Sequence, residues 1–114
     1  MTRRAPVVAL LAAMLVALGA CHPSFHAAPL PGAPTDATFA DIDGVHVHYR
    51  DQGHGPAVVL VHGFGGSLEH WATVAPALAA HHRVISLDLK GFGWTSRPEG
   101  DYSPAAEAQL VWHL

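Results

Sequence analysis

Residues 58–66 read Val58-Val59-Leu60-Val61-His62-Gly63-Phe64-Gly65-Gly66, an apolar run that leads directly into a glycine-rich turn. A strand that is apolar on both faces is typical of the inside of a parallel sheet. Glycines after such a strand leave backbone N–H groups exposed where a side chain would block them. The turn after this strand is therefore suited to holding an oxyanion.

The residues on either side of this stretch predict an α/β fold. Apolar residues around Asp43-Gly44 predict a hairpin that begins near Thr38. Residues 57–61 and 83–87 predict strands, and apolar residues at helical spacing predict one helix over residues 68–78 between them. A strand, a helix and a strand in this order predict a right-handed parallel crossover.

A last helix is predicted to begin at Ser103-Pro104, a polar cap followed by a proline suited to the first turn. The apolar residues Leu110, Val111 and Leu114 continue to the last position without a glycine, a proline or a C-terminal cap. The sequence therefore predicts that this helix is unfinished at Leu114.

Residues 1–20 predict an export signal. Arg3 and Arg4 precede an apolar run over residues 5–18, which is shorter than the roughly 18–20 residues of a membrane-spanning helix. Leu18-Gly19-Ala20-Cys21 resembles the lipobox of bacterial lipoproteins, which implies cleavage before Cys21 and a lipid on that cysteine. The alternative is an ordinary cleaved signal that ends near the single cysteine of the chain.

Residues 21–37 are rich in proline and alanine and predict an extended tether that joins a membrane to a folded domain over residues 38–114. Many lipoproteins of the inner membrane have aspartate after the lipidated cysteine, whereas this chain has His22, so the resemblance implies the outer membrane. The formal net charge is −3, and Arg3 and Arg4 leave with the signal, so nucleic acid is not an expected partner.

Two motifs resemble those of the α/β-hydrolases of the epoxide hydrolase, carbon–carbon bond hydrolase and esterase type. The first is His62-Gly63-Phe64-Gly65-Gly66 with Trp71 downstream, and the second is Asp88-Leu89-Lys90-Gly91-Phe92-Gly93. The resemblance covers residues 39–114. It implies the N-terminal part of an α/β-hydrolase sheet, an antiparallel hairpin followed by a parallel strand–helix–strand unit, which stops before the turn that carries the nucleophile.

The same resemblance implies roles for individual residues. The backbone N–H of Phe64 is one of two donors to the tetrahedral oxyanion. His62 is a structural residue of the oxyanion loop rather than the catalytic base, and Asp88 shapes the second loop rather than serving as the catalytic acid. The remaining glycines of the two loops are Gly63, Gly65, Gly66, Gly91 and Gly93.

The nucleophile of the family is missing from these residues. None of the serines stands in a Gly-x-Ser-x-Gly pattern, and the nearest imitation, Ser67, stands where a helix N-cap is expected. The chain is therefore expected to correspond to the first third of a hydrolase, inactive alone, with the strand ending at Val61 left as an unpaired edge.

The leading functional prediction is a serine hydrolase that acts on ester, lactone or carbon–carbon bonds of small hydrophobic substrates and needs no cofactor. An enzyme of the same fold with an aspartate nucleophile, acting on epoxides or halides, is the alternative. Phe64 and Gly65 depart from the residues that are usual in dehalogenases and epoxide hydrolases at these positions. A gene remnant without catalytic activity is a further alternative, because the triad is absent.

A rival prediction from another class is a histidine-rich, metal-binding surface lipoprotein. The chain has ten histidines, and His46 and His48 alternate on one predicted strand with Asp51 and His54 nearby. The simpler interpretation is an exposed hairpin whose outward face carries histidine. Without a cysteine, a third fixed ligand or a helical His-Glu pair, no metal site is predicted.

Overall fold

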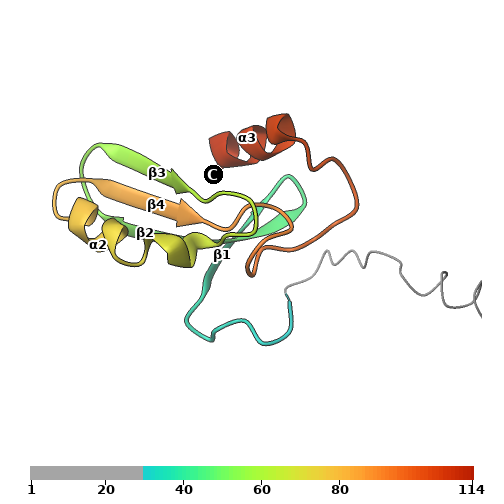
Figure 1. The fold of residues 1–114 in the computed structure, drawn as a ribbon, viewed down its shortest axis with the longest axis horizontal. Helices are drawn as coiled ribbons and strands as arrows, with labels where there is room; N and C mark the ends of the chain where they lie inside the picture. Colours follow the sequence, from blue (N-terminus) through green and yellow to red (C-terminus); the bar gives the residue numbers. More distant parts are fainter. Residues whose placement is uncertain (1–29) are drawn as a thin grey trace, which may run out of the picture.

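The computed structural model describes residues 30–114, so the predicted signal peptide, Cys21 and the first part of the predicted tether lie outside the described residues. The described residues form one mixed four-stranded sheet in the order β1-β2-β4-β3 (Figure 1). The elements in chain order are β1 (Thr38–Ile42), β2 (Val45–Gly53), β3 (Ala57–Val61), the 3-10 helix η1 (Leu68–Trp71), α2 (Val74–Ala79), β4 (Arg83–Leu87) and α3 (Pro104–His113).

The sheet combines an antiparallel hairpin with a parallel pair, which confirms the predicted fold class. β1 and β2 pair antiparallel around a turn in which Asp43 has φ +50° and Gly44 has φ +78°, as a two-residue hairpin turn of type I′ requires. β3 and β4 pair in parallel across η1 and α2. β4 lies between β2 and β3, and it is therefore the strand that joins the hairpin to the parallel pair.

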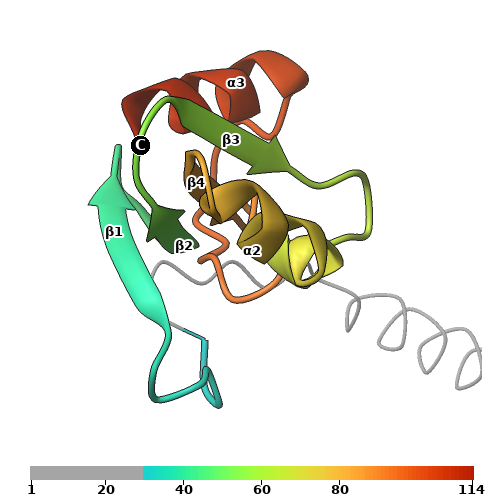
Figure 2. The ribbon, with the colours of Figure 1, turned by 90° about the vertical axis from the view of Figure 1, so that its left-hand side faces the viewer.

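Helices cover both faces of the sheet. α2 contacts β2 and β4 on one face, and α3 lies on the other (Figures 1 and 2). The buried cluster on the α3 face is formed by one side chain of α3 and four of the sheet: Leu110, Ile42, Val45, Val47 and Leu87. This cluster is small, because α3 covers only part of its face.

The prediction of one helix over residues 68–78 is wrong. The structure divides this segment into η1 and α2, with Ser67 accepting a hydrogen bond from the Glu69 N–H as the N-cap of η1. Pro76 provides the physical reason, since in a continuous helix from Leu68 it would stand in the interior without an N–H to donate. The break places Pro76 in the first turn of α2, where no such hydrogen bond is needed.

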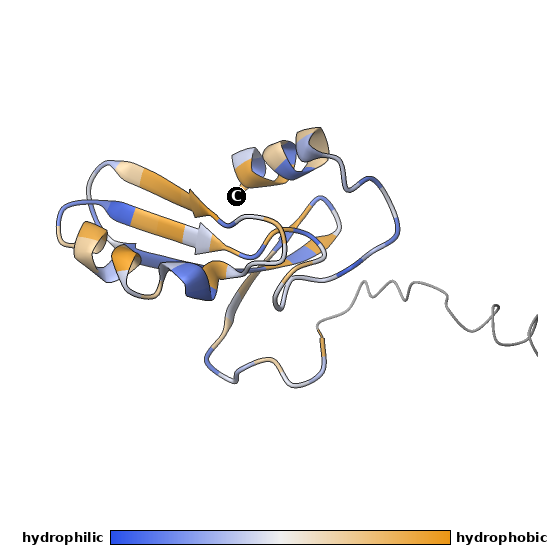
Figure 3. Ribbon diagram, in the orientation of Figure 1, coloured by the Kyte–Doolittle hydropathy of each residue, from blue (hydrophilic) through white to orange (hydrophobic). Residues whose placement is uncertain are grey.

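β3 is an edge strand of the described sheet. Its outer edge has no partner among residues 30–114, and Val59 and Val61 are 42% and 43% exposed. The strand is uniformly hydrophobic (Figure 3), in contrast to β1, the other edge strand, which carries Asp41. The sequence prediction of an apolar, unpaired edge at this strand is confirmed for the described residues.

The last residues of the predicted tether lie against the domain. Pro34, Asp36 and Ala37 line a small hollow of about 50 Å³ together with His48 and Arg50. Across residues 30–114, no helix has the length and apolar character needed to cross a membrane.

Candidate active site

The turn that follows β3 holds one peptide group in a fixed orientation. The Gly63 carbonyl accepts a hydrogen bond from the Gly66 N–H at 3.0 Å, and Gly65 has φ +72°, so residues 63–66 form a β-turn with a positive φ at its third position. Phe64 stands at the second position of this turn, beyond the end of β3. Its N–H belongs to the same peptide as the Gly63 carbonyl and donates no hydrogen bond within residues 30–114.

His62 fixes the same peptide from the other side. The Leu89 N–H donates to His62 Nε2 at 3.0 Å, so the ring proton is assigned to Nδ1. Nδ1 lies 2.8 Å from the Gly63 carbonyl and donates to it. Both ring nitrogens are therefore engaged in a buried side chain, and neither is free to take a proton from a substrate. Since the Gly63–Phe64 peptide is trans, the free Phe64 N–H points away from the donors that hold the carbonyl.

Asp88 connects three parts of the chain at the end of β4. Oδ1 accepts the Leu68 N–H at 2.7 Å, and Oδ2 accepts the Trp94 N–H and His48 Nδ1, each at 2.8 Å. Burial acts to raise the pKa of Asp88, but these three hydrogen bonds outweigh it and hold the pKa below its ordinary value. A carboxylate with both oxygens occupied in this way shapes the two loops around it.

Gly93 is required by the position of that carboxylate. Its φ is +48°, and a Cβ at this residue would lie 2.0 Å from Asp88 Oδ2. Any side chain here would displace the carboxylate from its donors. The second glycine of the same loop, Gly91, lies close to the ring of Tyr102.

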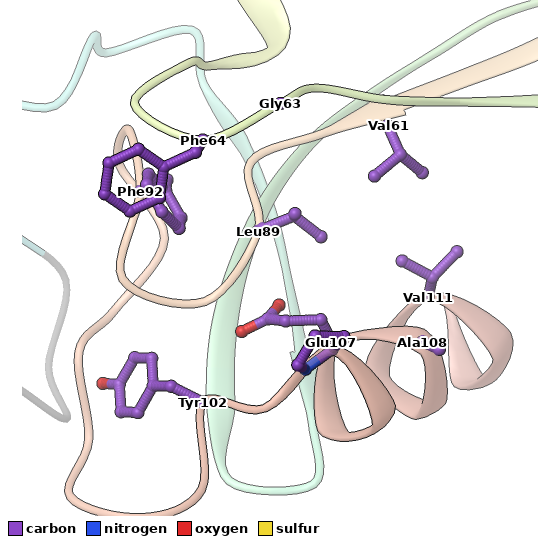
Figure 4. A pocket seen from close by; sticks show the side chains of 10 residues that line it. Val61, Gly63, Phe64, Leu89, Phe92, Tyr102, Glu107, Ala108 and Val111 are labelled. Atoms are coloured by element: carbon purple, nitrogen blue, oxygen red, sulfur yellow. The ribbon is translucent and has the colours of Figure 1, made fainter.

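A cavity of about 520 Å³ lies between the turn after β3, the loop after β4 and α3 (Figure 4). Gly63 and Phe64 line it, so the turn with the free amide forms part of its wall. The Phe64 side chain is fully exposed and meets Phe92 edge-on at 5.8 Å between ring centroids. The other walls are mainly apolar and include Val61, Leu89, Phe92, Ala108 and Val111.

Glu107 is the one carboxylate in the wall of this cavity, and the sequence analysis did not single it out. Its Oε2 accepts the Lys90 N–H at 3.1 Å, which joins α3 to the loop after β4. Burial raises the pKa of Glu107 above its ordinary value, although the Lys90 N–H opposes the shift. A glutamate on the otherwise apolar inner face of α3 was the signal available in the sequence.

The histidines of β2 do not form a metal centre with their predicted neighbours. His46 Nδ1 bonds to Asp41, His48 Nδ1 bonds to Asp88, and Asp51 pairs with Arg83. Within the described part of the chain, no group of three or more His, Cys, Asp or Glu side chains is arranged to hold a metal ion. The simpler interpretation of an exposed histidine face is wrong for His48, which is buried.

The sheet, the turn and the second loop together have the arrangement of an α/β-hydrolase fold. Residues 56–112 match the family model of the alpha/beta hydrolase fold, and the chain belongs to this family. Members of the family include hydrolases that act on small substrates. The oxyanion role of the Phe64 amide and the structural roles of His62, Asp88 and the loop glycines stay predictions.

Three relatives illustrate the range of the family. The chain is 41% identical over 68 residues to the 2-hydroxy-6-oxo-6-(2'-aminophenyl)hexa-2,4-dienoic acid hydrolase of Metapseudomonas resinovorans. The aligned residues make up 57% of this chain and 23% of that relative. The structure of the epoxide hydrolase CorEH superposes with a TM-score of 0.65 at 35% sequence identity, and the match covers 68% of this chain and 27% of the CorEH chain. The structure of a membrane phospholipase A superposes with a TM-score of 0.65 at 25% sequence identity, and the match covers 97% of this chain and 33% of the phospholipase chain.

The chain spans less than a quarter of the length of the curated relatives that match it first, at 23% and 22%.

Proposed function

We propose that these residues supply half of the oxyanion hole of a hydrolase that acts on ester, lactone or carbon–carbon bonds through a serine nucleophile. The observation that carries the proposal is the free Phe64 N–H, held in a peptide whose carbonyl is fixed by His62 and Gly66 and set in the wall of an apolar cavity. A fixed donor of this kind stabilises the negative charge that develops on a carbonyl oxygen in the transition state.

The chemistry follows from the state of the peptide before the reaction. Two hydrogen bonds already hold the Gly63 carbonyl, so the Phe64 amide does not have to reorient when the charge appears. Preorganisation of this kind makes a single donor worth about 3–4 kcal/mol in the transition state. The nucleophile, the acid and the base of the triad are proposed to come from elsewhere in the protein.

The cavity supports a substrate with a hydrophobic part. Apolar walls around the turn favour binding of an alkyl or aryl group beside the reacting carbonyl. The similarity to a membrane phospholipase A over almost all of this chain favours an ester of this kind. We also propose that Cys21 carries a lipid and anchors the protein to the cell envelope, with the outer membrane favoured by His22.

An aspartate nucleophile is the second candidate, because CorEH, an epoxide hydrolase, matches at the same TM-score as the phospholipase. Covalent labelling separates the two. In the whole protein that contains these residues, a fluorophosphonate ester labels an activated serine, so the proposal expects a labelled adduct together with turnover of 4-nitrophenyl butyrate. Hydrolysis of styrene oxide without labelling would replace the serine proposal by the aspartate one. If the protein is not labelled and hydrolyses neither 4-nitrophenyl butyrate nor styrene oxide, the hydrolase proposal is overturned.

A further inference from the structure

His48 is a buried titratable side chain that the proposed reaction does not use. It is 3% exposed, and Asp88, its partner, is 1% exposed. The two residues are joined twice, since the Asp88 N–H donates to the His48 carbonyl at 2.9 Å and His48 Nδ1 lies 2.8 Å from Asp88 Oδ2. An ionised carboxylate is an acceptor only, so Nδ1 is the donor of this side-chain hydrogen bond.

The partner of His48 leads directly to the oxyanion turn. The other oxygen of Asp88, Oδ1, accepts the Leu68 N–H at 2.7 Å. Leu68 is the first residue of η1 and stands two positions after the end of the turn. The residue after Asp88, Leu89, donates to His62, which directly precedes the turn. The residues that follow β4 therefore hold the segment over residues 62–68, which contains the turn, at both of its ends.

We infer that His48 is a positioning residue for the oxyanion turn: it orients the Asp88 carboxylate, which in turn fixes the end of the segment that carries the Phe64 amide. This inference rests on the proposed function, because it gives His48 an effect on the reaction through that amide. His48 itself is not among the residues that line the cavity.

The geometry explains why orientation of the carboxylate depends on His48. Oδ2 has two donors, His48 Nδ1 and the Trp94 N–H, whereas Oδ1 has the Leu68 N–H alone among residues 30–114. Without Nδ1, Oδ2 keeps only the Trp94 N–H, so we expect the carboxylate to rotate toward Trp94 and the hydrogen bond from the Leu68 N–H to lengthen. A displacement of about 1 Å in a catalytic group is sufficient to lower a rate by as much as 100-fold.

The neighbouring histidine of β2 provides a matched control. His46 lies on the same face and stacks on the same ring, with centroids of His46 and Phe39 4.5 Å apart against 5.2 Å for His48 and Phe39. Its Nδ1 bonds to Asp41 on the hairpin, not to Asp88. Loss of a histidine ring from this strand face is therefore separable from loss of the contact with Asp88.

The test compares His48→Phe, His48→Asn and His46→Phe in the active protein that contains these residues. Phenylalanine keeps a ring against Phe39 but has no donor, whereas the amide nitrogen of asparagine takes the place of Nδ1. We expect His48→Phe to lower kcat for a 4-nitrophenyl ester by about 10- to 100-fold with KM changed by less than about threefold. We expect His48→Asn to recover most of kcat and His46→Phe to leave it unchanged.

Hydrogen exchange of the Leu68 amide provides a readout that does not require activity. His48→Phe should speed this exchange at least about tenfold, and His48→Asn should restore protection. Equal kcat and equal exchange in His48→Phe and the unmodified protein would overturn the inference. So would an asparagine variant that melts normally but matches His48→Phe in both measurements. If no ester is hydrolysed by the unmodified protein, the proposed function fails, and the exchange measurement still decides whether His48 holds the turn.

Discussion

The Leu89 N–H donates to His62 Nε2 at 3.0 Å, and this hydrogen bond joins the turn after β3 to the loop after β4. Because the acceptor is Nε2, the ring proton lies on Nδ1 and is directed at the Gly63 carbonyl. The loop after β4 therefore sets the tautomer of His62, and that tautomer provides the Nδ1–H that holds the Gly63 carbonyl in the turn after β3. The two sequence motifs act as one structural unit, in which the second loop orients the free amide of the first.

The close approach of Gly93 to Asp88 predicts a large loss of stability in Gly93→Ala. The substitution strains a positive φ, which costs about 1–2 kcal/mol, and it also displaces a buried carboxylate from its donors. We expect a total loss of about 3–5 kcal/mol in chemical denaturation. Gly44→Ala is the control, since its φ is also positive but no atom lies within 4 Å of the added Cβ. Equal losses in the two variants would contradict the role of Asp88.

The raised pKa of Glu107 predicts a pH-dependent gain of stability in Glu107→Gln. A carboxyl whose pKa is higher in the folded state binds more protons when folded, so its contribution to stability falls as pH rises above its ordinary pKa of 4.5. Glutamine does not titrate, and its oxygen can still accept the Lys90 N–H. We expect the stability of the variant relative to the unmodified protein to increase between pH 4 and pH 7.

The control for this measurement is Glu99→Gln on the exposed loop before α3. The pH-dependent gain in Glu107→Gln should exceed any change in the control over the same pH range. A stability difference that stays constant from pH 4 to pH 7 would show that burial does not affect this carboxyl.

The open edge of β3 predicts self-association of residues 21–114 when they are produced alone. The strand carries no charge to prevent edge-to-edge pairing, and Val59 and Val61 are about two-fifths exposed. We expect light scattering to show aggregates, or circular dichroism to show a partly unfolded chain. Val59→Lys should reduce the aggregation, whereas Val74→Lys should not, since Val74 is 45% exposed but lies on α2. A monodisperse monomer that melts cooperatively would contradict this prediction.

The sequence predicted the elements whose signals are local. The strands over residues 57–61 and 83–87 form at the predicted residues, because each is an apolar run bounded by turn residues. The Asp43-Gly44 turn and the Ser103 cap of α3 also follow from local chemistry, and both are present. The break before α2 does not follow from the hydrophobic pattern, because the apolar residues keep helical spacing across Pro76.

The contacts that organise the site could not be predicted in the same way. His48 and Asp88 are 40 residues apart, and Lys90 and Glu107 are 17 apart, so no periodicity in the sequence relates them. Burial of His48 depends on the position of β4 beside β2, a pairing of strands that are not neighbours in the chain. Such long-range pairs appear only once the strand order is known.

The Phe64 amide is tested most directly by removing its hydrogen without disturbing the turn. Proline is favoured at the second position of such turns, so Phe64→Pro deletes the N–H while the backbone can keep its conformation. Phe64→Ala is the control, because it removes the exposed ring and keeps the donor. In the active protein we predict that Phe64→Pro lowers kcat for an ester by about 100- to 1,000-fold and that Phe64→Ala lowers it by less than about tenfold. Equal kcat in the two variants would contradict the assignment of this amide to the oxyanion hole.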